Sequence, residues 1–236
     1  MLNDKKILAV IPARGGSKRI KNKNIRPFCS KPLIVWTIEA AKSSRYIDRV
    51  VLSSEDPEII NIARQAGCDI PFVRPAELST DTVPGSAPIL HALENLPGYD
   101  YLVVLQPTCP MRTAQDIDRA LEKCVGGNFN SCVSVSEVTQ NPGWMFSIDS
   151  EGYMSKFLDG ELAPRSQELP TLVRLNGAIY IAETSWLEQE RKLVSDESIA
   201  FIMPEESSFD IDTEKDFRLT ELYMQNFILN KPMDNS

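Results

Sequence analysis

The sequence predicts an α/β protein built on a doubly wound, mostly parallel β-sheet. Short apolar segments alternate with amphipathic helical segments over residues 7–137, which is the pattern of successive βαβ units. The first apolar segment, Ile7–Ile11, stops at Pro12 and leads into a basic loop that contains two adjacent glycines. Because such sheets bind ligands where their strands end, this loop is the first candidate site.

Proline, glycine and threonine mark the ends of the expected helices. Pro32 opens a helix, because proline fits the first turn. A later helix beginning at Pro57 is closed by Gly67, and Thr113 is the N-cap of another. The expected helices are 32–42, 57–65, 88–96, 114–124, one beginning at Ser185 and one from Thr213 to about Leu229.

Short apolar runs between these helices predict the strands. The run Tyr101–Leu105 is the most apolar, so we expect it at the centre of the sheet, covered on both faces. The other strands expected after the first are 49–53, 70–73, 131–137, 175–182 and 199–203.

The alternation of strands and helices breaks at about Thr139. Residues 139–173 contain several prolines and glycines, a strand-like piece at 144–148, and large apolar side chains such as Tyr153 and Phe157. Apolar groups of this size pack either on their own chain or on a second copy. We therefore expect a small β-rich dimerisation arm inserted into a single domain of residues 1–236, with an intrachain flap as the alternative.

Composition excludes several classes of protein. The net charge of −8 disfavours nucleic acid as a partner. No apolar stretch approaches the roughly 20 residues of a membrane span, and the N-terminus leads straight into a strand without a secretory signal. Five cysteines without metal-site spacing predict free thiols in a reducing cytoplasm. His91 is the only histidine, which disfavours a histidine-based triad or metal site.

The basic loop after the first strand is suited to a polyphosphate. It carries Arg14, Lys18, Arg19, Lys21 and Lys23 around Gly15-Gly16 in a chain that is acidic overall. Backbone N–H groups and cations at a strand end favour several negative charges. A solvated basic loop is the alternative. The loop lacks both the dinucleotide fingerprint and the P-loop sequence, so a nucleotide here is held in another way.

Two aspartates near the C-terminus form a second candidate site. Asp210 and Asp212 lie at positions i and i+2 of an extended segment, which places both carboxylates on one side. Two adjacent carboxylates repel unless a cation lies between them, and Mg²⁺ is usually held by one or two carboxylates plus substrate phosphates. The alternative is that Asp212 or Thr213 only caps the following helix.

Several segments in chain order match a known family. They read IPARGGSKRIKNKN, KPLIVWTIEAA, RPAELSTDT, LQPTCPMR, RSQELP, RLNGAIYI and DIDTEKDF, and they extend from Ile7 to about Leu222. The set resembles the CMP-sialic acid synthetases, and more broadly the acylneuraminate cytidylyltransferases. The resemblance implies a Rossmann-like nucleotide-sugar transferase fold and a homodimer. It also implies Mg²⁺-dependent transfer of CMP from CTP to a nine-carbon 2-keto acid sugar such as N-acetylneuraminate or legionaminate, with release of pyrophosphate.

The resemblance also implies roles for individual residues. Residues for the CTP phosphates and base are Arg14, Ser17, Lys18, Lys23 and Asn24; residues for the sugar are Gln106, Arg165 and Asn176; the Mg²⁺ ligands are Asp210 and Asp212. Of these, Arg14, Lys18, Asp210 and Asp212 are the expected catalytic residues. The chain departs from the family pattern at Glu55, at Pro84-Gly85, at Cys109 and at Met111.

Two alternatives to this function stay open. One is the same chemistry on another acidic sugar, pseudaminate or 3-deoxy-manno-octulosonate. The other is a catalytically idle module that binds CTP without releasing pyrophosphate.

Overall fold

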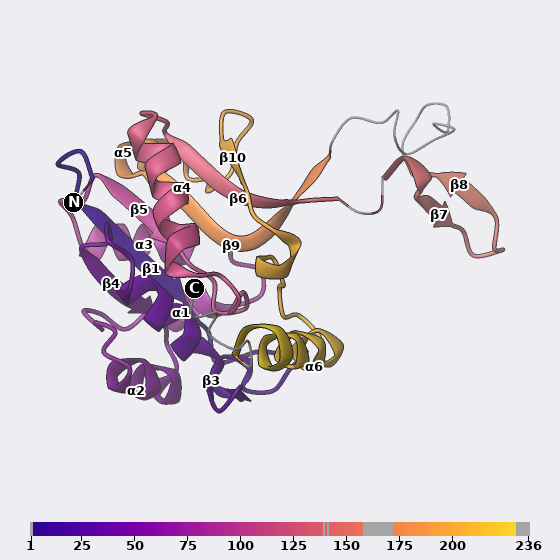
Figure 1. The fold of residues 1–236 in the computed structure, drawn as a ribbon, viewed down its shortest axis with the longest axis horizontal. Helices are drawn as coiled ribbons and strands as arrows, with labels where there is room; N and C mark the ends of the chain where they lie inside the picture. The colour runs from indigo at the N-terminus through magenta and orange to yellow at the C-terminus, as the bar shows by residue number, and fades with distance from the viewer. Residues whose placement is uncertain (1, 139, 141, 158–171, 230–236) are drawn as a thin grey trace, which may run out of the picture.

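A six-stranded sheet forms the centre of the computed structural model, which describes residues 2–138, 140, 142–157 and 172–229 (Figure 1). Its strands are β1 (Ile7–Pro12), β4 (Arg49–Ser53), β5 (Tyr101–Val104), β6 (Ser131–Glu137), β9 (Val173–Glu183) and β10 (Ile199–Ile202). Their order is β10-β6-β9-β5-β1-β4. β1 runs parallel to β4 and β5, and β10 runs parallel to β6, whereas β9 is antiparallel to both of its neighbours. The predicted mostly parallel sheet is confirmed, with β5 at its centre.

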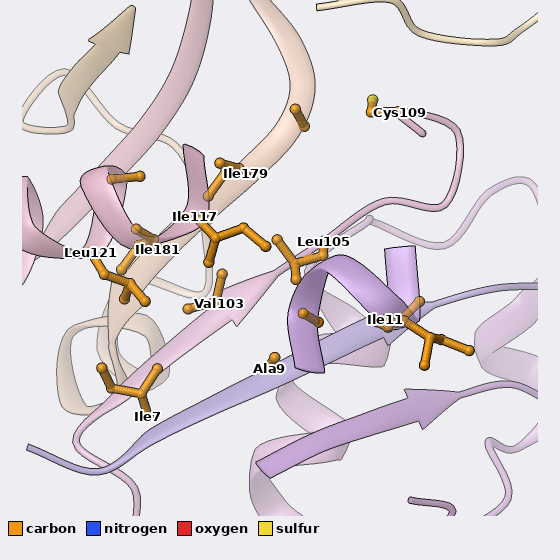
Figure 2. Close-up of a cluster of buried hydrophobic side chains, with 14 of the residues drawn as sticks. Ile7, Ala9, Ile11, Val103, Leu105, Cys109, Ile117, Leu121, Ile179 and Ile181 are labelled. Atoms are coloured by element: carbon orange, nitrogen blue, oxygen red, sulfur yellow. The ribbon is translucent and has the colours of Figure 1, made fainter. Parts of the chain in front are cut away.

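Helices cover both faces of this sheet. They are α1 (Leu33–Lys42), α2 (Pro57–Gln65), α3 (Ala87–Asn95), α4 (Ala114–Gly126) and α5 (Thr184–Glu190). The first, second and fourth pack on the face that carries Ile7, Ala9 and Ile11, which Figure 2 shows among the buried side chains. The third and fifth pack on the face that carries Leu8 and Val10. Alternate residues of β1 thus point to opposite layers, which is the doubly wound arrangement.

The helix boundaries agree with those predicted to within two residues. The last helix, α6 (Glu214–Tyr223), continues as π-helical turns over Met224–Leu229, where the predicted helix also ends. No helix in the described ranges is both long and apolar enough to cross a bilayer. All five cysteines are buried and free of disulfides, as predicted.

The predicted strand at 70–73 is wrong. Only Asp69 forms a bridge, to Val51 of β4, and the residues after it leave the sheet. Pro71 has no N–H to donate to a ladder, so it stops the pairing that the apolar residues around it would favour. β4 therefore stays at the edge of the six-stranded sheet.

A third apolar cluster joins the C-terminal helix to the N-terminal half of the chain. Phe28 contacts Phe217 of α6 edge-on, with ring centroids 5.4 Å apart. The same cluster buries Ile20, from the basic loop, and Ile211, from the segment between the two aspartates. The two candidate sites named from the sequence are therefore attached to one hydrophobic cluster.

The insertion after β6 contains a short hairpin that extends away from the sheet (Figure 1). Its strands are β7 (Phe146–Ile148) and β8 (Met154–Lys156), which pair antiparallel. Large apolar side chains are exposed along it, including Ile148 at 70% and Tyr153 at 71%. Arg165 and the rest of 158–171 lie outside the described residues.

Candidate active site

A cleft of about 630 Å³ opens at the carboxyl ends of β1 and β5. It is lined by seven of the ten residues named from the sequence: Arg14, Ser17, Lys18, Lys23, Asn24, Gln106 and Asp212. Another part of its wall comes from the polar stretch after α2 and the first turn of α3, with Arg74, Leu78, Ser79, Thr80, Asp81, Val83, Pro84, Gly85 and Pro88. The structure thus brings the basic loop and one of the two aspartates into a single cavity.

The basic loop is held in place by its own polar side chains. Asn24 is buried and donates from Nδ2 to the carbonyl oxygen of Arg14 at 3.0 Å. Lys23 donates from Nζ to the carbonyl oxygen of Ile211 at 2.7 Å and lies 3.4 Å from Asp212. Lys23 therefore connects the two candidate sites directly.

Gly15 is required by the close packing of this loop on the start of α2. A Cβ at this position would lie 2.1 Å from Oδ2 and 3.0 Å from Cβ of Asp56. Asp56 is the N-cap of α2 and accepts from the backbone N–H groups of Glu58 and Ile59. Any side chain on Gly15 would displace that cap.

An ion pair between the buried Arg74 and the partly exposed Glu55, which the sequence did not reveal, contacts the backbone at the start of the basic loop. Arg74 is 5% exposed and donates from Nη2 to the carbonyl oxygen of Ala13 at 2.7 Å, and the same nitrogen lies 3.2 Å from Glu55. Glu55 in turn accepts from the backbone N–H of Gly15 at 2.8 Å and from the hydroxyl of Ser79 at 2.7 Å. Desolvation raises the pKa of Glu55, but the hydrogen bonds from Ser79 and Gly15 outweigh it, so the pKa falls below its ordinary value.

Asp81 is a second residue that the sequence did not single out. Its Oδ1 lies 2.7 Å from Nη1 of Arg14, and its Oδ2 pairs with Nζ of Lys18. These hydrogen bonds, the one from Lys18 first, lower the pKa of Asp81. Each of the two expected catalytic cations of the loop thus faces the same carboxylate.

The segment after β5 is held rigidly by one buried arginine. Arg112 is 2% exposed and donates to the carbonyl oxygens of Gln106 at 3.3 Å and Ala178 at 2.8 Å, and to the hydroxyl of Thr37 at 2.7 Å. Burial lowers the pKa of Arg112 to about 10. The arginine that closes this segment in the sequence therefore points inward and fixes the backbone that presents Gln106.

Asp210 and Asp212 flank the buried Ile211. The carboxylate of Asp210 lies 3.8 Å from Sγ of Cys109, while that of Asp212 lies 3.1 Å from Nη1 of Arg19. Desolvation raises the pKa of Asp210, and the negative charge of Asp212 raises it further. The two carboxylates are therefore close enough to interact, and a cation between them would relieve this repulsion.

The structure does not bring Asn176 to the wall of the cleft. It is 3% exposed, and its side-chain oxygen accepts from Ser134 at 2.6 Å and from the backbone N–H of Ala178 at 3.1 Å. Its side-chain nitrogen donates to Ser208 at 2.9 Å. Asn176 therefore shapes the strand behind the cleft.

Comparison with known sequences gives a consistent result. The profile described as Cytidylyltransferase matches residues 8–157. CMP-N,N'-diacetyllegionaminic acid synthase of Legionella pneumophila is 37% identical over 93% of this chain and 97% of its own length. Pseudaminic acid cytidylyltransferase of Campylobacter jejuni is 34% identical, with 92% and 95% covered. N-acylneuraminate cytidylyltransferase of Escherichia coli is also 34% identical over 91% of this chain, which spans 51% of that longer protein.

A solved structure shows the same fold. It is that of CMP:2-keto-3-deoxy-manno-octonic acid synthetase complexed with CTP, which superposes with a TM-score of 0.70 over 93% of this chain and 98% of the other. The two sequences are 18% identical, so the likeness concerns the fold alone.

Proposed function

The chain belongs to the cytidylyltransferase family, and from this premise we propose that it transfers CMP from CTP to the anomeric hydroxyl of a nine-carbon 2-keto acid sugar. One observation carries the proposal: a cleft at the strand ends joins five cationic side chains to Asp212, whose neighbour Asp210 lies beyond the buried Ile211. The cations are Arg14, Lys18, Arg19, Lys23 and Arg74. This charge distribution suits a triphosphate at one end and a metal at the other.

The transfer is a nucleotidyl displacement. The anomeric oxygen forms a bond to the α-phosphorus, the bond from that phosphorus to the bridging oxygen breaks, and pyrophosphate leaves with the electron pair. The hydroxyl proton is lost to solvent. His91 is not the base, since it lies on α3 with its ring against Phe72 and does not line the cleft. Positioning and charge neutralisation therefore supply most of the rate enhancement.

We assign the phosphates to the basic loop. Arg14 and Lys18 lie where they can neutralise charge on the transferred group and the leaving pyrophosphate, and Ser17 lines the same wall. Lys23 is 14% exposed in its side chain and anchored to Ile211, so it offers a fixed positive charge between the loop and the aspartates. Asn24 holds the Arg14 backbone and lines the cleft, and we assign it to the CTP phosphates and base with the rest of the loop.

The aspartates fit a magnesium ion. Both donors are hard oxygen ligands, and their mutual repulsion favours a cation. Among the described residues no group of three or more acidic, histidine or cysteine side chains could hold a metal by itself, so substrate phosphates would complete the coordination. When bound, Mg²⁺ supplies Lewis-acid stabilisation of phosphate charge and acidifies a bound hydroxyl.

The sugar end of the site is assigned to Gln106 and Arg165, with Asn176 positioning the part of β9 that lies against Gln106. Gln106 lines the cleft, and an arginine such as Arg165 binds a carboxylate through two parallel hydrogen bonds. The 37% and 34% identities to legionaminate, pseudaminate and sialate enzymes support a nine-carbon acid without ranking the three. The sequence motifs lead us to place N-acetylneuraminate or legionaminate before pseudaminate. An eight-carbon acid, 3-deoxy-manno-octulosonate, is the remaining alternative.

We also propose that the hairpin of β7 and β8 pairs two chains into a homodimer. It extends away from the sheet, and exposes Ile148, Tyr153, Met154 and Phe157 by 63% or more. Monomeric proteins rarely expose so many neighbouring large apolar groups, so a second copy is the expected cover.

The deciding experiment measures pyrophosphate release from CTP and Mg²⁺. N-acetylneuraminate, legionaminate, pseudaminate and 3-deoxy-manno-octulosonate are tested in parallel, with ATP, GTP and UTP as controls. Release with one nine-carbon acid and CTP alone supports the proposal and identifies the substrate. CTP binding without release from any of the four acids would instead support an idle nucleotide-binding module.

A further inference from the structure

The strongest unassigned feature of the cleft is the position of Asp81. Its two carboxylate oxygens are divided between two cations, Arg14 on one and Lys18 on the other. Both cations lie on the loop proposed for the phosphates, and Asp81 lies on the facing wall of the same cleft. A carboxylate bridging two cations there takes the place that an anionic phosphate group would fill.

The same paired arrangement is found for all five cations that line the cleft. Arg19 and Lys23 face Asp212, and Arg74 faces Glu55. A polyphosphate therefore competes with carboxylates when it binds, and the exposed pairs are the easiest to replace. Two pairs are exposed on both sides, Lys18–Asp81 at 79% and 42% and Arg19–Asp212 at 70% and 55%, whereas the Arg74 side chain is 4% exposed. Asp212 is assigned to the metal, which leaves Lys18–Asp81 as the exposed pair that a phosphate can replace. Exposed ion pairs contribute little stability, so this one can be exchanged.

The backbone around Asp81 also permits an exchange. Residues 80–86 form turns without a strand or helix, and they are followed by α3 from Ala87. Thr80 and Val83 share one backbone hydrogen bond of 3.4 Å, at the long end of the range. A side chain on such a segment can withdraw without breaking regular secondary structure.

We propose that Asp81 is a phosphate stand-in: it holds Arg14 and Lys18 in their binding positions in the empty enzyme and gives them up to the triphosphate of CTP. This inference rests on the proposed use of the basic loop for phosphates. It assigns to Asp81 the role of a positioning residue that keeps two long, entropically costly side chains ordered before the substrate arrives. It also predicts that removing the Asp81 carboxylate increases the affinity for phosphate, whereas removing a residue that binds phosphate would decrease it.

The test is calorimetric titration of the full-length protein with inorganic tripolyphosphate at low ionic strength. The variants Asp81→Asn and Asp81→Ser remove the charge from an exposed position. Asp69→Asn is the matched control, because Asp69 has a similarly exposed side chain, at 49%, and pairs with Arg49 away from the cleft. Each substitution changes the net charge by the same single unit, so a general charge effect would appear in all three.

We expect both Asp81 variants to bind tripolyphosphate roughly two- to tenfold more tightly than the natural protein, the range expected from losing two exposed competing ion pairs. The difference should shrink as salt is raised, because exposed charges are screened. Asp69→Asn should bind as the natural protein does. Weaker binding by the Asp81 variants, an equal gain in Asp69→Asn, or no tripolyphosphate binding by the natural protein would overturn the inference.

The result separates this inference from the proposed function. Tripolyphosphate binding is measured without sugar or turnover. Tighter binding by Asp81→Asn therefore supports the proposed role of Asp81 even if no tested acid leads to pyrophosphate release. Conversely, normal cytidylyl transfer with no change in tripolyphosphate affinity would leave the function standing and refute the role of Asp81. Circular dichroism melting of each variant shows that the fold is retained.

Discussion

The α-carbon of Gly177 lies against the side chain of Gln106, so closely that a Cβ on the glycine would be 3.1 Å from Oε1 of Gln106. The same Cβ would be 3.4 Å from Sγ of Cys109 and 3.6 Å from Oδ2 of Asp210. Gly177 has a φ of +74°, which L side chains rarely adopt. A glycine in β9 thus leaves room for Gln106, a proposed sugar ligand, next to Asp210, a proposed metal ligand.

Replacing Gly177 by alanine should therefore impair the site as well as the fold. We expect the KM for the sugar to rise about tenfold or more because Gln106 is displaced, with a stability loss of roughly 1 kcal/mol from the positive φ. Gly98→Ala is the control, since Gly98 has a φ of +94° with open space around it. Steady-state kinetics and urea unfolding check both variants; equal kinetic effects in the two would contradict the role of Gly177.

Asp212→Asn should reduce kcat by roughly 100-fold, because the proposed metal loses one of its two protein ligands. The KM for CTP should not rise, since the substitution also frees Arg19 and Lys23 from a competing carboxylate. The Mg²⁺ concentration that gives half-maximal activity should rise. Glu214→Gln, which removes a nearby carboxylate paired with Arg26, is the control. Near-normal activity of Asp212→Asn would contradict the assignment of Asp212 as a metal ligand.

Substitutions of Glu55 should act mainly on CTP binding. Alanine removes the acceptor of the Gly15 N–H and the carboxylate partner of the buried Arg74, which keeps its bond to the Ala13 carbonyl oxygen. Glutamine can still accept from Gly15. We expect the KM for CTP to rise more in Glu55→Ala than in Glu55→Gln, with a smaller change in kcat. We also expect a stability loss of about 1–3 kcal/mol in the alanine variant. Kinetics at saturating sugar together with denaturant unfolding measure both effects, and the reverse order of the two variants would refute the assignment.

Arg112→Met should destabilise the protein by roughly 3 kcal/mol, because it removes the buried guanidinium bonds to the Gln106 and Ala178 carbonyl oxygens and to the Thr37 hydroxyl. Arg119→Met, at an exposed position on α4, should lower the free energy of unfolding by less than about 0.5 kcal/mol. Urea midpoints of the two variants give the comparison. A small loss at Arg112 would show that the segment after β5 is held by other contacts.

Ile148→Glu should abolish the proposed dimer, because a charge would be placed in an apolar interface. Leu222→Glu, at a 55% exposed position on α6, is the control and should leave the assembly unchanged. Light scattering after size-exclusion chromatography gives the mass directly. A natural protein that elutes as a monomer would refute the proposal without any variant.

Local patterns were enough to predict most of this fold and part of the site. Apolar periodicity and helix caps such as Thr113 depend only on residues that are close together in the sequence. The basic loop is likewise one contiguous segment of the chain. By contrast, Glu55 follows the edge strand β4 directly, whereas Arg74 comes after α2 and returns beside the end of β4, where its N–H donates to the Ser54 carbonyl oxygen. Neither residue carries a local signal of the other. The strand predicted at 70–73 does not form because Pro71 has no N–H to donate, although the apolar residues around it favour a strand.

The antiparallel placement of β9 has a consequence for how the chain folds. Strands β4, β1 and β5 form one parallel group and β10 and β6 another, and only β9 connects them. Because β9 begins at Val173 and β10 at Ile199, a nascent chain that ends before them leaves one edge of β5 and both edges of β6 unpaired. Such edges favour association with other chains. Fragments truncated within the insertion should therefore aggregate during synthesis, and folding should be slow, since its last step closes contacts far apart in sequence.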